Sequence, residues 1–439
     1  MFWKCGSFEF DCRCPHVMGI VNMTPDSFSG DGLVSDTQAA LAQARAMIEA
    51  GAEIIDVGGE STRPGADPVS IEEEWARIEG VVSALAAEGV CVSVDTRHAA
   101  VAERALAAGA SIVNDVSGFQ DPAMVEAVRS TDAGLVVMHM QGEPKTMQDD
   151  PHYEDVVAEV CAFLGQQAAL LEDRGISPDR ICVDPGPGFG KTPQQTVELL
   201  RNLHEVRHLG YPVMCAVSRK SFITRAYKLD AQDIPARDEA SAAEALLAAE
   251  LGASIIRVHN VPATVKALKE LRPYVILSLG SNVALVAEAG EEDEAKQAQI
   301  NLGIGKLCQL PDSLLIDAAP FYRSKAAYKE DQDDFVNTAV LLRTGLPPRE
   351  LLDCLHAIED MLGRVRTEPN GPRTLDIDIV DYQMYSYATE DLALPHPRAT
   401  ERDFVVKPIE AILPGHILAD GRPIDELPQA KRLGAAERL

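Results

Sequence analysis

Val17-Met-Gly-Ile-Val-Asn22 is a short apolar stretch that ends in a polar side chain, and Met23-Thr-Pro-Asp-Ser-Phe-Ser29 follows it directly. The first stretch is typical of a strand buried on both faces, with Asn22 at its carboxyl end. The second stretch predicts a loop, because Pro25 fixes its own backbone angle and the aspartate and serines favour turns. A buried strand that leads into a polar loop is the repeating unit of enzymes built on a (β/α)₈ barrel.

The same order of helix, turn and strand recurs over the first 270 residues. Gly51-Ala52, Gly109-Ala110 and Gly252-Ala253 each end an alanine-rich stretch and begin an apolar one. Glycine at a helix C-terminus readily takes the left-handed conformation that turns the chain back. The pattern predicts an α/β fold, a TIM (β/α)₈ barrel, rather than an open sheet. We expect its strands near residues 17–22, 54–59, 91–95, 112–116, 135–140, 181–185, 213–218 and 255–259, and a hairpin within residues 2–16 that closes one end.

Polar side chains gather at the ends of the expected strands, and these ends meet at one face of such a barrel. Taken singly, Asp95 or Asn114 is equally well explained as a helix cap, Lys220 as a surface lysine, and Arg257 with His259 as a salt bridge at the rim. Their shared placement favours a functional site. Carboxylates and an amide suit the donor-rich edge of a flat heterocycle, whereas arginine and histidine suit a phosphate or pyrophosphate.

Five long motifs resemble the dihydropteroate synthases over essentially residues 15–270. They are Met18-Gly-Ile-Val-Asn-Met-Thr-Pro-Asp-Ser-Phe-Ser, Asp56-Val-Gly-Gly-Glu-Ser-Thr-Arg-Pro-Gly, Met138-His-Met-Gln-Gly-Glu-Pro, Asp184-Pro-Gly-x-Gly-Phe-Gly-Lys and Ser218-Arg-Lys-Ser. This family joins 4-aminobenzoate to 7,8-dihydropterin-6-ylmethyl diphosphate and releases pyrophosphate. The resemblance also implies a homodimer formed through the barrel, and competition by sulfonamides at loops that carry Phe28, Thr62 and Pro64.

The resemblance assigns a role to each matching residue. It implies that Mg²⁺ with the pyrophosphate lies against Asn22, and that pyrophosphate leaves first while metal and cations stabilise the departing charge. It assigns catalysis to Asp95, Lys220, Arg257 and His259. It places Asp95, Asn114, Asp184 and Lys220 on the pterin, with Met138 among the substrate-binding residues. It places Arg63, Arg257 and His259 around the anion. Beside the aminobenzoate it places Thr62, Pro64, Phe189, Lys220 and Ser221.

A second domain is expected from residue 273 to residue 439, joined to the barrel of residues 1–272 with almost no linker. Strands near 274–280, 313–323, 335–343 and 374–380, with helices near 291–307 and 346–362, give the order βαββαβ of a smaller ferredoxin-like α+β domain. Within the last strand, Asp376-Ile-Asp378 places two carboxylates on one face, which suits Mg²⁺ bridging nucleotide phosphates. Taken alone, this pattern is more simply an exposed strand face.

With Gly371-Pro-Arg-Thr-Leu-Asp-Ile-Asp and Leu394-Pro-His-Pro-Arg, residues 274–420 resemble 6-hydroxymethyl-7,8-dihydropterin pyrophosphokinases. This family transfers a diphosphate from ATP, its co-substrate, to the pterin alcohol. The resemblance implies two Mg²⁺ on Asp376 and Asp378. It also implies a phosphate clamp of Arg364, Arg373, His396 and Arg402, a catalytic role for Arg373, a pterin site of Phe335, Asn337 and Phe404, and a nucleotide-side position for Glu359.

Two alternatives are open at this point. The family is usually richer in aromatic and basic residues where this chain has Thr367-Glu-Pro-Asn370, so the second half could instead bind pterin or nucleotide without catalysis and regulate the synthase. The first half could be a corrinoid-type methyltransferase domain that shares the pterin barrel, although the Ser-Arg-Lys-Ser and Thr-Arg-Pro motifs argue against this.

The composition limits the other classes of function. A net charge of −28 argues against nucleic-acid binding and is most simply a solvated acidic surface. The nine cysteines are scattered, and the one close pair, Cys12 and Cys14, has no second pair to complete a zinc site, so we expect a reducing, cytoplasmic location. No run approaches the ~18 apolar residues of a membrane helix, so no membrane partner is expected.

Overall fold

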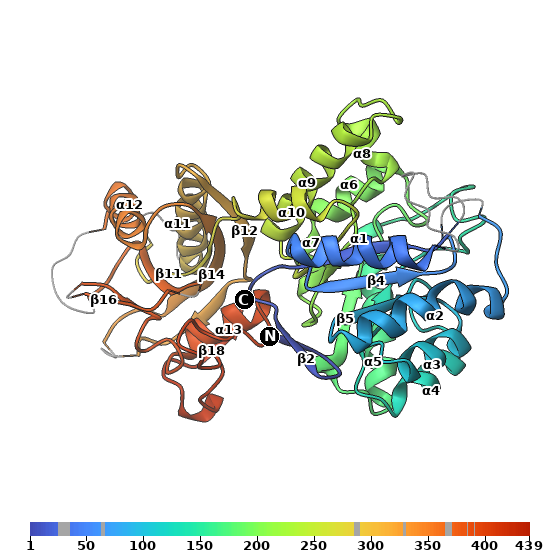
Figure 1. Ribbon diagram of the computed structural model, residues 1–439. Helices are drawn as coiled ribbons and strands as arrows, with labels where there is room; N and C mark the ends of the chain where they lie inside the picture. The colour runs from blue at the N-terminus through green and yellow to red at the C-terminus, as the bar shows by residue number, and fades with distance from the viewer. Residues whose placement is uncertain are drawn as a thin grey trace. The chain divides into compact units, whose positions relative to one another are not determined.

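The computed structural model describes residues 1–24, 36–62, 66–284, 290–327, 331–364, 371–383, 385–389 and 391–439 (Figure 1). The chain divides into two compact units, Met1–Leu271 and Arg272–Leu439. The boundary expected from the sequence lies one residue away from this division. In the part of the chain that is described, no helix combines the length and the apolarity that a membrane span requires.

The first unit is a closed barrel of eight parallel strands, as the sequence predicts. The strands follow the order β8-β7-β6-β5-β4-β3-β10-β9, and a parallel bridge between Val183 and Val213 closes the ring. The strands are β3 (His16–Asn22), β4 (Ile54–Gly58), β5 (Cys91–Asp95), β6 (Ile112–Asp115), β7 (Gly134–Met138), β8 (Ile181–Asp184), β9 (Met214–Cys215) and β10 (Ile255–Val258).

Helices surround this barrel (Figure 1). Side chains alternate along each strand, so Val92 and Val94 of β5 pack into the large core beneath the helices while Ser93 and Asp95 take the opposite, inward positions. Asp36 caps α1, since its side chain accepts a hydrogen bond from the Ala39 N–H at 2.8 Å. The helices are α1 (Thr37–Glu49), α2 (Ile71–Ala87), α3 (Ala99–Ala107), α4 (Pro122–Arg129), α5 (Val156–Asp173), the 3₁₀ turn η1 (Pro178–Arg180), α6 (Pro193–Arg201), α7 (Leu203–Arg207), α8 (Ser221–Ala226), α9 (Ile234–Glu250) and α10 (Val261–Leu268).

The predicted N-terminal hairpin is confirmed, and it plugs the end of the barrel where the strands begin. Strands β1 (Phe2–Cys5) and β2 (Phe8–Asp11) are antiparallel. Trp3 is fully buried, and its indole N–H donates to the Arg180 carbonyl at 2.9 Å. The hairpin residues Trp3, Cys5 and Phe10 share one apolar cluster with a single inward residue from each of the eight strands: Met18, Ile54, Cys91, Ile112, Val136, Cys182, Met214 and Ile255.

Truncating this plug should destabilise the barrel. We expect Trp3→Ala to lower the unfolding free energy of the first unit by about 3–5 kcal/mol, because a fully buried ring leaves a cavity among eight strands. Denaturant unfolding followed by circular dichroism measures this change. Trp3→Phe is the matched control, since it keeps a ring in place and loses mainly the hydrogen bond to Arg180. Equal losses in the two variants would contradict the packing explanation.

The second unit is an antiparallel sheet with helices, and the predicted order βαββαβ is confirmed apart from one strand that is divided in two. Its sheet runs β15-β11-β14-β13-β18, with β12 also pairing with β14. The expected strand over 313–323 is divided in two, because Pro320 cannot donate a backbone hydrogen bond. The elements are β11 (Tyr274–Ser281), α11 (Glu292–Leu307), β12 (Ser313–Ala318), β13 (Tyr322–Ser324), β14 (Phe335–Thr344), α12 (Pro348–Met361), β15 (Asp376–Tyr382), β16 (Tyr387–Ala388), β17 (Ala393–Leu394), α13 (Asp403–Ile412), the 3₁₀ turn η2 (Gln429–Lys431) and β18 (Ala436–Arg438).

The two sheet faces of this unit differ in character. Ile300 of α11 and Leu355 of α12 pack with Leu279, Val336 and Ile377 of the central strands in one apolar core. Because side chains alternate with a period of two, the neighbours of these strand residues take the other face. That face therefore carries the polar positions of β11, β14 and β15.

Candidate active sites

Polar residues replace the apolar ones toward the carboxyl ends of the barrel strands. Asp56 on β4, Asp95 on β5, Asn114 on β6 and Asp184 on β8 occupy inward positions, and all four are buried. Arg257 of β10 is a fifth member. The structure thus places Asp95, Asn114, Asp184 and Arg257, all selected from the sequence, on strands of one barrel. Asp56 was not selected, although a charged residue inside an otherwise apolar strand was a usable signal.

Arg257 lies between two of these carboxylates. Its Nε donates to Asp56 Oδ2 at 2.6 Å and its Nη2 to Asp95 Oδ2 at 2.7 Å. The Asn114 amide donates to Asp56 Oδ2 at 3.4 Å. Asp56 Oδ1, Asp95 Oδ1 and Asn114 Oδ1 are buried and have no hydrogen-bond partner among the described residues. Buried acceptors are normally satisfied, so these three oxygens suit a ligand that supplies N–H donors.

The electrostatics of this group depend on burial. Burial raises the pKa of Asp95 to about 7, while the charge of Arg257 acts in the opposite direction. Burial also raises the pKa of Asp184, against the charge of Lys220. Burial lowers the pKa of Lys220 to about 8, and Asp184 partly compensates. Asp95 and Lys220 therefore change charge near neutral pH, as groups at functional sites commonly do.

Lys220 and Phe189 meet across the loop that follows β8. The Lys220 ammonium lies 4.5 Å from the centre of the Phe189 ring and donates to the Pro187 carbonyl. Asp184 Oδ1 accepts from the Gly186 N–H at 2.8 Å, which holds the start of the loop. Ser221 is exposed and begins α8 directly after Lys220.

A buried lysine, Lys191, also holds the loop that follows β8. Lys191 Nζ donates to the carbonyls of Gly186 at 3.1 Å and Phe189 at 3.0 Å, and lies 2.9 Å from His139 Nδ1. Burial lowers the pKa of Lys191 to about 7 and that of His139 to about 3. Neither residue was selected from the sequence, although both stand in the quoted motifs.

The other residues that were selected in the barrel lie at or after strand ends, or outside the residues that the structure describes. The His259 N–H donates to Ser218 Oγ at 3.1 Å, and Asn22 ends β3 opposite Gly58 of β4. Met138, at the end of β7, pairs with Asp184 of β8 and is buried. Thr62 is half-buried. Phe28, Arg63 and Pro64 lie outside the described residues.

Glu60, Glu74 and His98 form a group whose oxygen and nitrogen atoms lie within 4.8 Å of one another. Arg97 already occupies both oxygens of Glu60, at 2.8 and 3.2 Å. His98 Nδ1 lies 2.6 Å from Glu74 Oε2, and this hydrogen bond raises the pKa of His98. The positive and negative charges balance, so we interpret the group as ion pairs that hold the loop after β4, not as a metal centre.

The second unit contains a pocket of about 650 Å³, including its open mouth. Across three neighbouring strands, Asp376, Gly280 and Asn337 lie side by side, with Asp378 and Ser278 in the next pair. A methyl group added at Gly280 would lie 3.0 Å from Asn337 Oδ1, so glycine leaves the pocket floor open. The lining includes the selected residues Phe335, Asn337, Arg373, Asp376, Asp378, Arg402 and Phe404.

Three arginines surround the two carboxylates of this pocket. Arg373 and Arg364 both pair with Asp376, Arg364 at 2.6 Å, and Arg402 lies 3.5 Å from Asp378. Partial burial and the neighbouring Asp376 raise the pKa of Asp378 to about 6. A divalent cation would relieve the repulsion between these carboxylates, so their chemistry and placement fit Mg²⁺.

Two more of the selected residues, Glu359 and His396, are not among those that line the pocket. Glu359 is fully buried, accepts from the Ile377 N–H at 2.7 Å and pairs with Arg364. His396 donates its backbone N–H to the Val380 carbonyl at 2.7 Å. Burial, together with Arg402 and Arg398, lowers the pKa of His396 to about 4, so its ring is neutral at pH 7.

Comparison with known proteins matches each unit to a known family. The family model described as pterin binding enzyme matches residues 18–259, and the model of 7,8-dihydro-6-hydroxymethylpterin-pyrophosphokinase matches residues 276–414. Fold and site together therefore define a pterin-binding barrel enzyme joined to a pyrophosphokinase unit.

Individual relatives narrow this class. Dihydropteroate synthase of Neisseria meningitidis serogroup C is 49% identical over 271 residues, which cover 61% of this chain and 95% of that protein. The structure of Burkholderia cenocepacia dihydropteroate synthase complexed with 7,8-dihydropteroate is 43% identical, with a TM-score of 0.55, and covers 61% of this chain and 94% of that chain. The Xanthomonas albilineans synthase with 4-aminobenzoic acid is 42% identical, with a TM-score of 0.57, and covers 61% and 96%.

The chain belongs to the dihydropteroate synthase family and carries a 6-hydroxymethyl-7,8-dihydropterin pyrophosphokinase domain in the same polypeptide. It is thus a bifunctional enzyme of folate biosynthesis.

Proposed function

We propose that the two sites catalyse consecutive reactions on one pterin. The second unit transfers a diphosphate from ATP to 6-hydroxymethyl-7,8-dihydropterin, and the barrel condenses the resulting pterin diphosphate with 4-aminobenzoate. The observation that supports this assignment best is the set of three unpartnered, buried oxygens on Asp56, Asp95 and Asn114. A pterin ring presents N–H donors along one edge, which is the chemistry that these acceptors lack.

In the barrel, we assign the pterin to Asp95, Asn114 and Asp184, with Met138 and Lys220 at its border. Asp56 adds a further acceptor to the set carried over from the family. Arg257 is bound to two carboxylates, so its main effect on the pterin is to hold Asp56 and Asp95 in place. Its contact with the diphosphate stays a prediction.

The departing pyrophosphate is assigned to Asn22, Arg63 and His259, and Asn22 would hold Mg²⁺. A bound Mg²⁺ would supply positive charge that stabilises the leaving group. Ser218 holds the imidazole of His259 through Nδ1 at 3.0 Å, which orients the ring. The cations thus act on the anion, while the carboxylates of the pterin site face the positive charge that develops at the methylene carbon.

The 4-aminobenzoate is assigned to Thr62, Pro64, Phe189, Lys220 and Ser221. The Lys220 ammonium lies over the Phe189 ring, so a positive charge stands next to a flat apolar surface. This combination suits an aromatic carboxylate. The aromatic amine is neutral near pH 7, so it needs no strong base to attack. Sulfonamides should compete for this position, and inhibition that is independent of the 4-aminobenzoate concentration would contradict the assignment.

In the second unit, we assign two Mg²⁺ to Asp376 and Asp378, where they would neutralise the phosphates of ATP. Arg373, Arg364 and Arg402 approach the same carboxylates and are assigned to the transferred phosphates, with His396 beside them. Phe335, Asn337 and Phe404 line the pterin side of the pocket. Glu359 supports Arg364 from the buried side, at the back of the nucleotide site.

The pH dependence of the synthase follows from Asp95 and Lys220. Below about pH 7 Asp95 becomes protonated and loses its charge, and above about pH 8 Lys220 loses its proton. We therefore expect kcat/KM for pterin diphosphate to be bell-shaped, with its maximum between these values. Lys220→Arg should move the alkaline limb upward and leave the acid limb in place. An alkaline limb that does not move would contradict the role of Lys220.

The proposal is tested by two parallel reactions of the purified protein, each with Mg²⁺ and 4-aminobenzoate. One receives the pterin diphosphate, and the other receives the pterin alcohol with ATP. We expect dihydropteroate in both. Product from the diphosphate alone would refute the kinase assignment and favour a regulatory second unit.

We also propose that the protein forms a homodimer through the barrel, an expectation that comes from the family resemblance. Sedimentation as a monomer at micromolar concentration would contradict it.

A further inference from the structure

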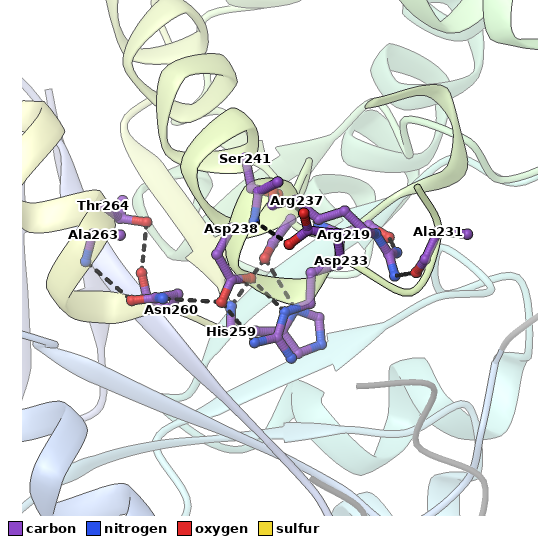
Figure 2. A network of polar contacts seen from close by, with 12 residues as sticks. Arg219, Ala231, Asp233, Arg237, Asp238, Ser241, His259, Asn260, Ala263 and Thr264 are labelled. Carbon is purple, nitrogen blue, oxygen red and sulfur yellow. Dashed lines mark hydrogen bonds and ion pairs between the residues drawn. The ribbon is translucent and has the colours of Figure 1, made fainter. Parts of the chain in front are cut away.

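Helix α9 contributes a buried carboxylate, Asp238, that has no assigned role in the synthase site (Figure 2). Arg219 binds it with two hydrogen bonds, Nε to Oδ1 at 2.6 Å and Nη2 to Oδ2 at 2.9 Å. The same Oδ2 accepts from Asn260 Nδ2 at 3.0 Å. One carboxylate therefore joins the loop after β9 to the residues after β10.

Arg219 requires firm support because its φ of 57° lies in the left-handed region, which non-glycine residues rarely adopt. Its backbone N–H donates to Ser241 Oγ at 2.9 Å, and its carbonyl accepts from the Arg237 guanidinium. Figure 2 shows Arg237, Asp238 and Ser241 of α9 pointing toward Arg219. A single helix thus holds the backbone and the side chain of Arg219 together, which is how strained residues persist.

The partners of Asp238 are the direct neighbours of Lys220 and His259, two of the residues assigned to the substrates. Lys220 follows Arg219 in the chain, and Asn260 follows His259. Asn260 also caps α10, since its Oδ1 accepts from the Ala263 N–H at 3.1 Å. A shift of the Asp238 carboxylate would therefore be transmitted to Lys220 through Arg219 and to His259 through Asn260.

We propose that Asp238 is a positioning residue of the synthase reaction, which sets the spacing between Lys220 and His259 without touching a substrate. This inference rests on the proposed function, because that function assigns Lys220 and His259 to the substrates. A buried ion pair that only stabilised the fold would affect the melting temperature but not the separate kinetic constants.

The first test is Asp238→Asn, which keeps the shape of the side chain and removes its charge. We expect kcat/KM of the synthase to fall about 10- to 100-fold, with a higher KM for pterin diphosphate, because small displacements of reacting groups have effects of this size. The ATP-dependent reaction of the second unit, in the same polypeptide, should be unchanged. Asp233→Asn is the matched control on the same helix, since asparagine caps a helix as well as aspartate does.

The second test restores a carboxylate next to Arg219 by placing it on residue 260 in place of residue 238. Asn260 Nδ2 and Arg219 Nη2 both contact Asp238 Oδ2, so a carboxylate at position 260 would again face Arg219. We expect Asp238→Asn combined with Asn260→Asp to recover most of the activity that Asp238→Asn loses. A double variant that melts like the parent but stays as inactive as Asp238→Asn would overturn the proposal.

Lys220→Met separates this inference from the proposed function. If Lys220→Met loses synthase activity while Asp238→Asn keeps it, the positioning role of Asp238 is wrong and the proposed site stands. If Lys220→Met keeps full activity, the assignment of the site itself is wrong. Loss in both variants, with rescue by the relocated carboxylate, supports the proposal.

Discussion

Replacing both Asp376 and Asp378 with asparagine should abolish ATP-dependent diphosphate transfer while the same protein still converts supplied pterin diphosphate to dihydropteroate. We expect the first rate to fall by at least about 10³-fold, because the pair is assigned to the metal and the metal to the charge of the transferred group. Asparagine preserves the side-chain shape and leaves Arg364, Arg373 and Arg402 with oxygen acceptors. The measurement compares AMP formation from ATP with dihydropteroate formation from the diphosphate.

Asp353→Asn is a suitable control for this experiment, since its carboxylate lies on α12 with 62% of the side chain exposed. It should leave both activities unchanged. ATP turnover that survives in the variant lacking both carboxylates would show that the metal is held elsewhere. Parallel loss of both activities would point instead to unfolding, which the melting temperature would reveal.

Replacing Asp95 with asparagine should lower the synthase activity of the barrel but raise its stability at pH 8. We expect kcat/KM of the synthase to fall about 10²- to 10³-fold, because an amide cannot supply the charge that a carboxylate offers to pterin donors and to a developing cation. At pH 8 the same variant should be more stable than the parent by about 1 kcal/mol or more, which corresponds to about 2–4 °C in melting temperature. Arg257 keeps its bond to Asp56 in this variant.

The sign of the stability effect follows from the raised pKa of Asp95. The folded protein keeps this proton up to about pH 7, whereas the unfolded chain loses it near pH 4. The cost of the buried charge therefore grows as the pH rises between these values and is complete above pH 7, so asparagine should stabilise at pH 8 and have little effect near pH 4. Asp121→Asn, at the exposed cap of α4, controls for the substitution itself. A melting temperature that falls at pH 8 would contradict the cause assigned to the pKa.

Much of the fold could be predicted from the sequence because local signals agree with it. Strands such as Cys91–Asp95 are apolar and short, glycines end the helices, and the chain order β-α is repeated. The division at Pro320 and the two-residue length of β9 could not be predicted from apolar runs, since hydrogen bonding between strands decides where a ladder ends.

The site residues at strand ends could be selected because a barrel brings those ends together, whatever the details of packing. Lys191 and Asp238 could not, because each acts through contacts with distant segments: Lys191 reaches His139, 52 residues away, and Asp238 reaches Arg219 and Asn260. The spacing of residues along the sequence carries no information on such long-range contacts. The structure also gives Arg257 two carboxylate partners inside the barrel, where the sequence suggested either a bound anion or a salt bridge at the rim.

The hairpin of residues 2–11 has a consequence for the traffic of small molecules. Because Trp3 and Phe10 fill the end of the barrel where the strands begin, substrates reach the interior from the opposite end. Two substrates must enter and two products must leave through that end, so the molecule that binds deepest must bind first and dissociate last. Pterin diphosphate is then expected to bind before 4-aminobenzoate, and pyrophosphate held at the rim should obstruct the next arrival.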